Sequence, residues 1–340
     1  MKAMVLTGAG EAEFHDIEKP EPGPGETLVR VTSTGICGTD LKIYQGGIPV
    51  DYPRVMGHET VGVVEAGGPL ASGTRVIVDP AYSCGACYNC RDNQEHLCPN
   101  GGLIGRDING GFADYMVAPS SNVYELPDDV GDDIAPLIQP MTTCLHAQRK
   151  CNIKPGEAVI VMGLGVTGMM HVQLAKAHGA YPVIGITRSQ WKLDLAKELG
   201  ADFTLAPSED TKEKVLELTN GRGADLVIES VGQLTVLGQA IDLARTGGRI
   251  LPFGIYTQRE ANLPFYDLYF KELNVINARV AKAEDFPACV DFVQRGVVDL
   301  APIISNTIKF ENMDEALELL DNGGGRTMKI ILNHNETLAA

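Results

Sequence analysis

Three side chains in the first sixty residues could bind one metal ion. Cys37 follows a Gly-Ile pair, and His58 and Glu59 are adjacent. Thiolate, imidazole and carboxylate are the ligands of catalytic zinc sites, which keep one coordination position open. Each residue alone has an ordinary explanation: a small buried hydrophobe, a core histidine and a surface acid. Together with the cysteines that follow, they favour a catalytic zinc site.

Four further cysteines lie in one short segment: Cys84, Cys87, Cys90 and Cys98. Four thiolates complete a tetrahedral Zn²⁺ site, which is structural because no position stays open. The segment has little apolar material, so metal binding would supply its folding free energy. The alternative is a redox-active or disulfide-bonded set. Cysteines clustered in this way favour metal binding in a reducing compartment, and we expect the cytoplasm.

A dinucleotide-binding turn is predicted in the middle of the chain. The apolar stretch 158–162 is typical of a buried parallel strand, Gly-Leu-Gly-Val-Thr-Gly follows, and a helical pattern begins near Met169. The glycines would allow a tight turn, an approach to a pyrophosphate and close helix packing. An ordinary glycine-rich turn is the alternative, but the strand and helix around it favour cofactor binding. The predicted cofactor-binding residues here are Gly163, Leu164, Gly165, Val166 and Gly168.

The end of the next predicted strand, 182–186, indicates which nicotinamide cofactor fits. An acidic residue there would bind the ribose 2′-hydroxyl of NAD. This chain instead has Thr187, Arg188 and Ser189. The guanidinium could pair with a 2′-phosphate, and the hydroxyls could donate to it. We therefore predict NADP(H), with NAD(H) as the alternative if Arg188 only stacks on adenine or faces solvent.

Composition narrows the classes of partner. The formal net charge is −16, whereas nucleic acids and anionic membranes bind basic surfaces. The N-terminal apolar stretch is too short for a signal peptide, and no apolar run approaches the length of a membrane-spanning helix. We expect a cytoplasmic protein that acts on a small molecule.

Behind these motifs, the sequence predicts an α/β protein with two domains. Short alternating stretches such as 27–31 and 61–65 indicate a mostly-β N-terminal part. From Lys150 onward, apolar strands alternate with helices, which indicates a doubly wound parallel sheet. Residues 271–279 are expected to be its last strand, after which the chain should return to the first part. We predict one domain from 1–146 and 283–340, with a dinucleotide-binding domain, 147–282, inserted in it.

These motifs resemble the zinc-dependent medium-chain alcohol and polyol dehydrogenases, in the branch of the sorbitol, threonine and glucose dehydrogenases. The matching segments occur in the family's order: 35–40, 57–59, 84–98, 110–115 and 163–168. The resemblance implies a GroES-like catalytic domain and a Rossmann cofactor domain. It implies catalytic zinc on Cys37 and His58, with Glu59 as a ligand or beside one, and structural zinc on the four cysteines. It also implies that Thr39 begins a proton relay, and that the chain forms a homodimer or homotetramer.

One position departs from this branch. Where the branch has Glu-Pro at a metal-facing position, this chain has Gln139-Pro140. A neutral amide oxygen is a weaker zinc ligand than a carboxylate and leaves more positive charge on the metal, which should be a stronger Lewis acid. Alternatively, Gln139 hydrogen-bonds a water molecule or the substrate.

The predicted activity is hydride transfer between a secondary alcohol, polyol or sugar and NADP(H). Tyr44, Phe112 and His146 are further candidates for the substrate pocket or the proton relay, and a place in the core or on the surface explains them equally well. Two other functions stay open: a zinc-independent enone or quinone reductase on the same fold, and a non-catalytic NADP(H)-binding zinc protein. The complete set of zinc-ligand residues favours the dehydrogenase over both.

Overall fold

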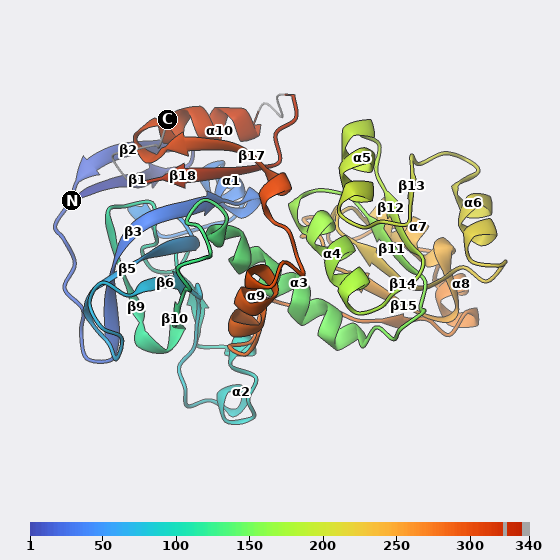
Figure 1. Ribbon diagram of the computed structural model, residues 1–340, viewed down its shortest axis with the longest axis horizontal. Coiled ribbons are helices and arrows are strands. Elements are labelled where there is room, and N and C mark those ends of the chain that lie inside the picture. The colour runs from blue at the N-terminus through green and yellow to red at the C-terminus, as the bar shows by residue number, and fades with distance from the viewer. Residues whose placement is uncertain (322–324, 335–340) are drawn as a thin grey trace. The chain divides into compact units, whose positions relative to one another are not determined.

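A computed structural model describes residues 1–321 and 325–334. The chain forms two compact units, and Figure 1 labels their elements. The first unit comprises Met1–Thr142, Val280–Gln294 and Ile303–Ala340, and the second comprises Thr143–Arg279 and Arg295–Pro302. The predicted first domain also contains residues 322–324 and 335–340, which lie outside the described part of the chain.

The first unit is built around β3 (Glu26–Ile36), an eleven-residue strand. It pairs antiparallel with β5 (Glu59–Gly67), β9 (Tyr115–Pro119) and β18 (Lys329–Asn333). The sheet continues through β6 (Arg75–Val78) and β10 (Val123–Glu125) on one side, and through β17 (Ile304–Lys309) on the other. Apolar side chains of β3, including Val29 and Val31, are buried, because apolar residues along the strand face the core of the unit.

Smaller elements complete this unit. β1 (Lys2–Gly8) pairs with β2 (Glu11–Asp16) and β4 (Arg54–Val55), and β7 (Ala81–Tyr82) pairs with β8 (Gly102–Leu103). Its helices include α1 (Gly38–Tyr44), α2 (Tyr88–Arg91), α9 (Asp285–Gln294) and α10 (Met313–Asp321). One core joins Met4 of β1, Ile43 of α1 and Met313 of α10. This packing fixes the position of α1, which follows β3 in the chain.

The second unit contains the predicted parallel sheet, in the order β13-β12-β11-β14-β15-β16. The strands are β11 (Val159–Met162), β12 (Val183–Ile186), β13 (Phe203–Leu205), β14 (Ala224–Glu229), β15 (Ala244–Pro252) and β16 (Asn274–Val275). The helices are α4 (Val166–Ala177), α5 (Gln190–Glu198), α6 (Thr211–Leu218), α7 (Leu234–Leu243) and α8 (Phe265–Phe270). A further helix, α3 (Ile138–Cys151), leads into this unit.

Helices cover both faces of this sheet. Ile160 and Met162 of β11 share a core with Val215 of α6 and Ala240 of α7. The intervening Val161 faces the other side, where Gly168 of α4 packs against it. Figure 1 shows α4 and α5 on one side of the strands and α6 on the other. The predicted doubly wound sheet is therefore confirmed.

The last strand of this sheet is shorter than predicted. Of residues 271–279, only Asn274 and Val275 pair with β15. The residues before them close α8: the Leu273 N–H donates to the Leu268 carbonyl at 3.1 Å, and Glu272 has a φ of +49°. A helix end that reverses the chain in this way leaves few residues for pairing.

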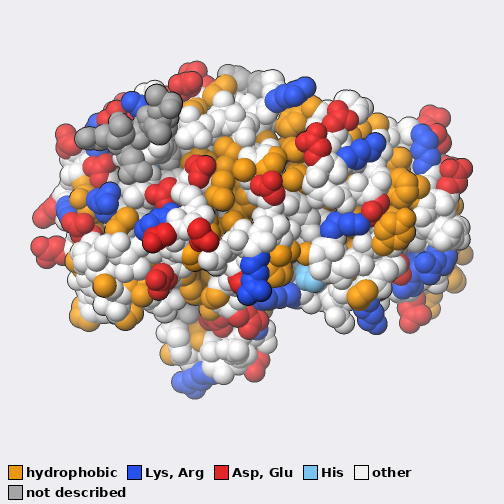
Figure 2. All heavy atoms as spheres, in the orientation of Figure 1, with side chains coloured by type: hydrophobic (Ala, Val, Ile, Leu, Met, Phe, Trp, Pro, Cys, Tyr) orange, Lys and Arg blue, Asp and Glu red, His pale blue; other side chains and the backbone are white. Residues whose placement is uncertain are grey.

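No helix within residues 1–321 and 325–334 is long and apolar enough to cross a membrane. On the face shown in Figure 2, acidic and basic side chains are interspersed.

Candidate active site

The antiparallel register of the first unit brings distant segments to one corner. Cys37 follows the last residue of β3, and His58 precedes the first residue of β5. Gly35 pairs with Glu59 across these two strands, and Lys329 begins β18 on the other side of β3. Strand pairing, rather than proximity in sequence, therefore assembles this site.

The three predicted metal ligands of the first unit lie together. Cys37, His58 and Glu59 each offer a ligand atom, and these atoms lie within 4.8 Å of one another. His58 and Glu59 are buried, and Cys37 is half-buried. Gly35 makes room for the carboxylate, because a β-carbon there would lie 1.9 Å from Glu59 Oε2. A thiolate, an imidazole and a carboxylate at this spacing fit the donor preferences of Zn²⁺.

Asp40 orients two of these ligands from the first turn of α1. Its Oδ1 lies 3.1 Å from His58 Nδ1, and its Oδ2 accepts a hydrogen bond from the Cys37 N–H at 2.8 Å. A carboxylate that holds Nδ1 leaves Nε2 for a metal. Burial alone would lower the pKa of His58, but Asp40 and Cys37 raise it well above its usual value. Sequence reasoning gave Asp40 no role, although an acid three residues after a predicted ligand was a usable signal.

Lys329 balances the charge of Glu59. Its Nζ lies 2.7 Å from both carboxylate oxygens and donates to the Ile36 carbonyl at 3.0 Å. Burial would lower the pKa of Lys329, but Glu59 and Cys37 raise it above its usual value, so the ammonium stays charged. The two side chains are 270 residues apart in the sequence, and sequence reasoning missed the lysine.

The roles of Thr39 and Gln139 stay predictions, and the structure gives their places in the fold. Thr39 is half-buried in the first turn of α1, two residues after Cys37. Gln139 is buried at the start of α3, where its main-chain carbonyl accepts a hydrogen bond from the Thr142 hydroxyl at 2.6 Å. Contact between the Gln139 amide and a metal stays a prediction.

The weaker candidates are placed as follows. The Tyr44 hydroxyl donates to the Gly10 carbonyl at 3.0 Å, and its ring packs against the core that contains the fully buried Phe112. His146 is buried in the part of α3 that belongs to the second unit. Tyr44 and Phe112 therefore pack in or against the core of the first unit.

The four clustered cysteines also converge. Their sulfur atoms lie within 4.8 Å of one another, with 3.4 Å between Cys87 and Cys90, 3.4 Å between Cys84 and Cys98, and 3.8 Å between Cys87 and Cys98. Tetrahedral Zn²⁺ with Zn–S bonds of about 2.3 Å sets its sulfurs about 3.8 Å apart. The thiols are free, and N–H groups of Ala86 and Cys87 lower the pKa of Cys84 to about 6. The cluster fits a four-thiolate zinc site.

A cavity of about 460 Å³ lies in the second unit. Met162 and Ile186, the last residues of β11 and β12, line it together with Ser230, which follows β14. The chain passes from β11 to β12 on one side, whereas β14 lies on the other. Doubly wound sheets bind ligands at the carboxyl ends of strands where the order reverses in this way.

Most of the predicted cofactor residues line this cavity. Among them are Gly163, Leu164, Gly165, Thr187 and Arg188. The others lie beside it in the chain: Val166 and Gly168 in the first turn of α4, and Ser189 at the N-cap of α5. A β-carbon at Gly168 would lie 2.0 Å from the Gly163 carbonyl oxygen, so helix and turn could not pack this closely with a larger residue.

Sequence reasoning missed a second cation at this cavity. Lys192, in the first turn of α5, lines it together with Arg188, and the lining residues include no acid. Burial lowers the pKa of Lys192. The signal was available, because Lys192 lies four residues after Arg188 in the chain, in the first turn of the helix that follows the strand. Two cations without an acid among the lining residues favour an anionic ligand.

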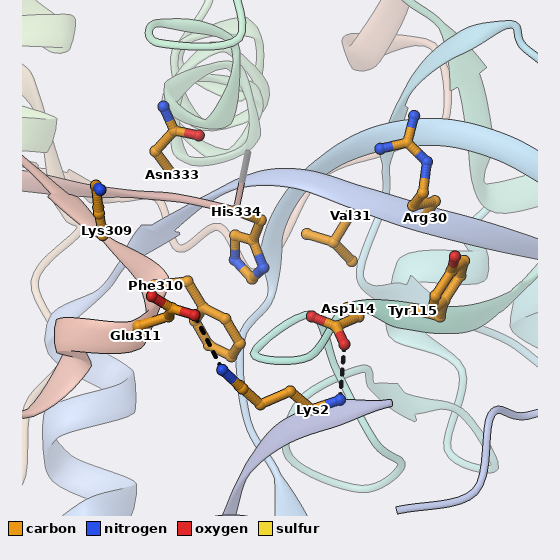
Figure 3. Close-up of a pocket in the computed structure, with 10 residues that line it drawn as sticks. All are labelled: Lys2, Arg30, Val31, Asp114, Tyr115, Lys309, Phe310, Glu311, Asn333 and His334. Carbon is orange, nitrogen blue, oxygen red and sulfur yellow. Dashed lines mark hydrogen bonds and ion pairs between the residues drawn. The ribbon is translucent and has the colours of Figure 1, made fainter. Parts of the chain in front are cut away.

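A separate cavity of about 570 Å³ lies in the first unit. Figure 3 shows Lys2 joined to Glu311 and Asp114, in a pocket that the rings of Phe310 and His334 also line. The His334 ring stacks on Phe310 with centroids 4.1 Å apart, and burial lowers the pKa of His334 to about 3. The lining residues include both basic and acidic side chains and none of the predicted site residues.

Comparisons with known proteins agree along the whole chain. A family model for the alcohol dehydrogenase GroES-like domain matches residues 23–128, and one for zinc-binding dehydrogenases matches residues 166–295. A sorbitol dehydrogenase of Halalkalibacterium halodurans is 34% identical over 341 residues, covering 98% of this chain and 99% of the relative.

Two solved structures show the same fold. A protein of Sinorhizobium meliloti 1021 bound to NADP has a TM-score of 0.91 and 32% identity, covering 98% of each chain. The alcohol dehydrogenase rspB of Escherichia coli CFT073, complexed with NADH, has a TM-score of 0.91 and 30% identity, covering 98% of this chain and 99% of the other.

Proposed function

The chain belongs to the zinc-dependent medium-chain alcohol and polyol dehydrogenases, and on that premise we propose that it transfers a hydride between a secondary alcohol, polyol or sugar and NADP(H). The alcohol would lose a hydride to NADP⁺ and a proton to solvent. The observation that carries the proposal is the cluster of Cys37, His58 and Glu59, whose ligand atoms lie within 4.8 Å of one another.

Cys37 and His58 would hold the catalytic zinc, and Asp40 would keep the imidazole in the ligating orientation. Zinc bound there would supply a Lewis acid for the negative charge that develops on the alcohol oxygen. Because Lys329 occupies both oxygens of Glu59, we propose that Glu59 lies next to the metal rather than as its permanent ligand. Gln139 would face the metal or a water on it. Cys84, Cys87, Cys90 and Cys98 would hold the structural zinc.

Thr39 would carry the substrate proton away from the site. Its side chain belongs to the first turn of α1, two residues after the half-buried Cys37. A hydroxyl both donates and accepts hydrogen bonds, so it can pass a proton without becoming charged. Loss of this hydroxyl should lower kcat more than it changes the affinity for the cofactor.

The cofactor would bind in the cavity of the second unit. Its pyrophosphate would lie over the turn from Gly163 to Gly168, at the N-terminus of α4. Arg188 and Lys192 support NADP(H), because the residues that line the cavity include these two cations and no acid. The Arg188 guanidinium and the Lys192 ammonium would bind the negatively charged 2′-phosphate of NADP(H).

We also propose that the chain assembles as a homodimer or homotetramer through the edge of the second unit's sheet. β16 is the edge strand, and α8 beside it exposes Phe265, Tyr266, Tyr269 and Phe270, each by more than 60%. Exposed sheet edges and aromatic patches favour association. Tyr266→Ser with Tyr269→Ser should reduce the mass measured by light scattering, and an unchanged mass would locate the interface elsewhere.

The deciding experiment compares wild type with Cys37→Ala and with Cys151→Ala, a buried cysteine outside both clusters. Wild type and Cys151→Ala should oxidise at least one alcohol from a panel of polyols, aldoses, threonine and secondary alcohols. Cys37→Ala should lose this turnover, by about a thousandfold or more, but still bind NADP⁺. Undiminished turnover in Cys37→Ala, or enone reduction that resists a chelator, would refute the zinc mechanism. Bound cofactor and zinc without turnover on any substrate would indicate a non-catalytic protein.

A further inference from the structure

Glu229 is a fully buried carboxylate at the end of β14, outside both the cysteine clusters and the predicted cofactor-binding residues. Its Oε1 accepts a hydrogen bond from the Val231 N–H at 2.8 Å, and both oxygens lie 3.1 Å from the Gly232 nitrogen. Its Oε2 also accepts a hydrogen bond from the Tyr256 hydroxyl. The hydrogen-bond donors to this carboxylate are therefore uncharged, and they come from two separate loops, one after β14 and one after β15.

The main chain of Glu229 ties the same two loops. Its carbonyl accepts hydrogen bonds from the N–H groups of Phe253 and Gly254, at 2.8 and 2.9 Å. The loops approach so closely that a β-carbon at Gly254 would lie 2.1 Å from the Gly232 nitrogen. Side chain and main chain of one residue thus clamp residues 230–232 to residues 253–256.

The first of these loops is a wall of the cofactor cavity, which Ser230 and Val231 line. Ser230 donates its N–H to the Met162 carbonyl at 2.8 Å, and its hydroxyl lies 2.8 Å from that of Thr167 in α4. A β-carbon at Gly163 would lie 2.5 Å from Val231 Cγ2. The wall therefore packs directly on the glycine-rich turn.

We infer that Glu229 is a positioning residue for the dinucleotide: it holds the 230–232 wall at the distance from the glycine-rich turn that the cofactor requires. The inference rests on the proposed function, since it needs NADP(H) or NAD(H) in this cavity. A carboxylate suits the task because it accepts all of these hydrogen bonds and donates none. An amide keeps one accepting oxygen but turns an N–H₂ group toward the remaining donors.

The test measures cofactor affinity in four variants of the zinc-loaded protein. Glu229→Ala, Glu229→Gln and Tyr256→Phe each remove part of the clamp. Asp225→Asn is the matched control, because Asp225 is a buried carboxylate at the opposite end of β14, where it accepts hydrogen bonds from the Ala158 N–H and Arg245. The fluorescence of bound NADPH gives Kd, with the emission of Trp191, the only tryptophan, as a second signal.

We expect Glu229→Ala to raise Kd by about tenfold or more and Glu229→Gln by about threefold to tenfold, the range for the loss of a typical hydrogen bond. Tyr256→Phe should raise Kd by a smaller factor, and Asp225→Asn should lower thermal stability but leave Kd within about twofold of wild type. If Glu229→Ala does not fold, Glu229→Gln and Tyr256→Phe decide. A Kd within about twofold of wild type in both would reduce Glu229 to a stabilising residue and overturn the inference. If wild type itself binds neither NADPH nor NADH, the proposed function fails, and the inference fails with it.

Discussion

Lys329 Nζ lies 2.7 Å from both carboxylate oxygens of Glu59, and both side chains are almost fully buried. The pair joins β5 to β18 across the end of β3, at the corner that also holds Cys37 and His58. The Glu59 carboxylate therefore lies beside the proposed metal site, and the Lys329 ammonium balances its negative charge. The ion pair therefore bears on the stability of the first unit as well as on the chemistry of the site.

Lys329→Met should destabilise the first unit by about 3–5 kcal/mol, because it leaves the Glu59 carboxylate buried without its partner. Denaturant unfolding of the zinc-loaded protein measures this loss. Adding Glu59→Gln to Lys329→Met should restore part of it, since the uncompensated charge is then gone.

Lys2→Met is the matched control for that measurement. Lys2 forms an ion pair with Glu311 at 2.9 Å (Figure 3), but both side chains are largely exposed. Exposed pairs contribute little to stability because solvent screens them, so this variant should unfold almost as wild type does. Equal losses in the two lysine variants would contradict the importance of burial at Glu59.

Arg188→Ala should change the choice of cofactor. If the guanidinium binds the 2′-phosphate, its loss should lower kcat/KM for NADP⁺ by about tenfold to a hundredfold, the range for hydrogen bonds between charged groups. The value for NAD⁺ should stay nearly constant. Steady-state kinetics with both cofactors measures the ratio, and Arg222→Ala, an exposed arginine of the same unit, is the control. A wild-type preference for NAD⁺ would contradict the assignment.

Metal analysis should find two zinc ions per chain in wild type and one in Cys90→Ala. Loss of the structural ion should also lower Tm by about 5 °C or more, because zinc binding contributes folding free energy and each kcal/mol corresponds to roughly 2–4 °C in domains of this size. Cys151→Ala should keep both ions. Full zinc content in Cys90→Ala would show that the four thiols do not form the predicted site.

Asp79→Asn should stabilise the protein most at high pH. Burial, with smaller effects of Glu95 and Asp285, raises the pKa of Asp79 from 3.8 to about 7. Between these values the unfolded chain releases a proton that the folded state keeps, so wild-type stability falls as the pH rises from about 4 to about 7. The asparagine does not titrate and retains the oxygen that accepts the Ala81 N–H.

The measurement is Tm against pH for both proteins at constant zinc. The stability of the variant relative to wild type should increase from pH 4 to pH 7 and then stay constant. The increase should be at most about 1.4 kcal/mol for each pH unit. Parallel curves over this range would contradict a neutral, buried Asp79 in the folded state.

The sequence alone was sufficient for features whose signal lies within about thirty residues of chain. The glycine-rich turn after β11 and the four-cysteine segment are of this kind, because a strand, a turn and a helix, or four closely spaced thiols, are recognised from local pattern. The fold class followed from the same evidence, and the comparisons confirm it. The strand predicted over 271–279 was mostly wrong, because the reversal that closes α8 uses the first of those residues.

Only the tertiary structure decided which distant groups meet. The contacts of Lys329 with Glu59, of Asp40 with His58 and of Tyr256 with Glu229 depend on strand register and on the packing of loops at the carboxyl ends of strands. A one-residue change of register would turn the strand residues Lys329, Glu59 and Glu229 to the opposite faces of their sheets. Residue type therefore states what chemistry a side chain can perform, whereas the pairing of strands determines which partners it has.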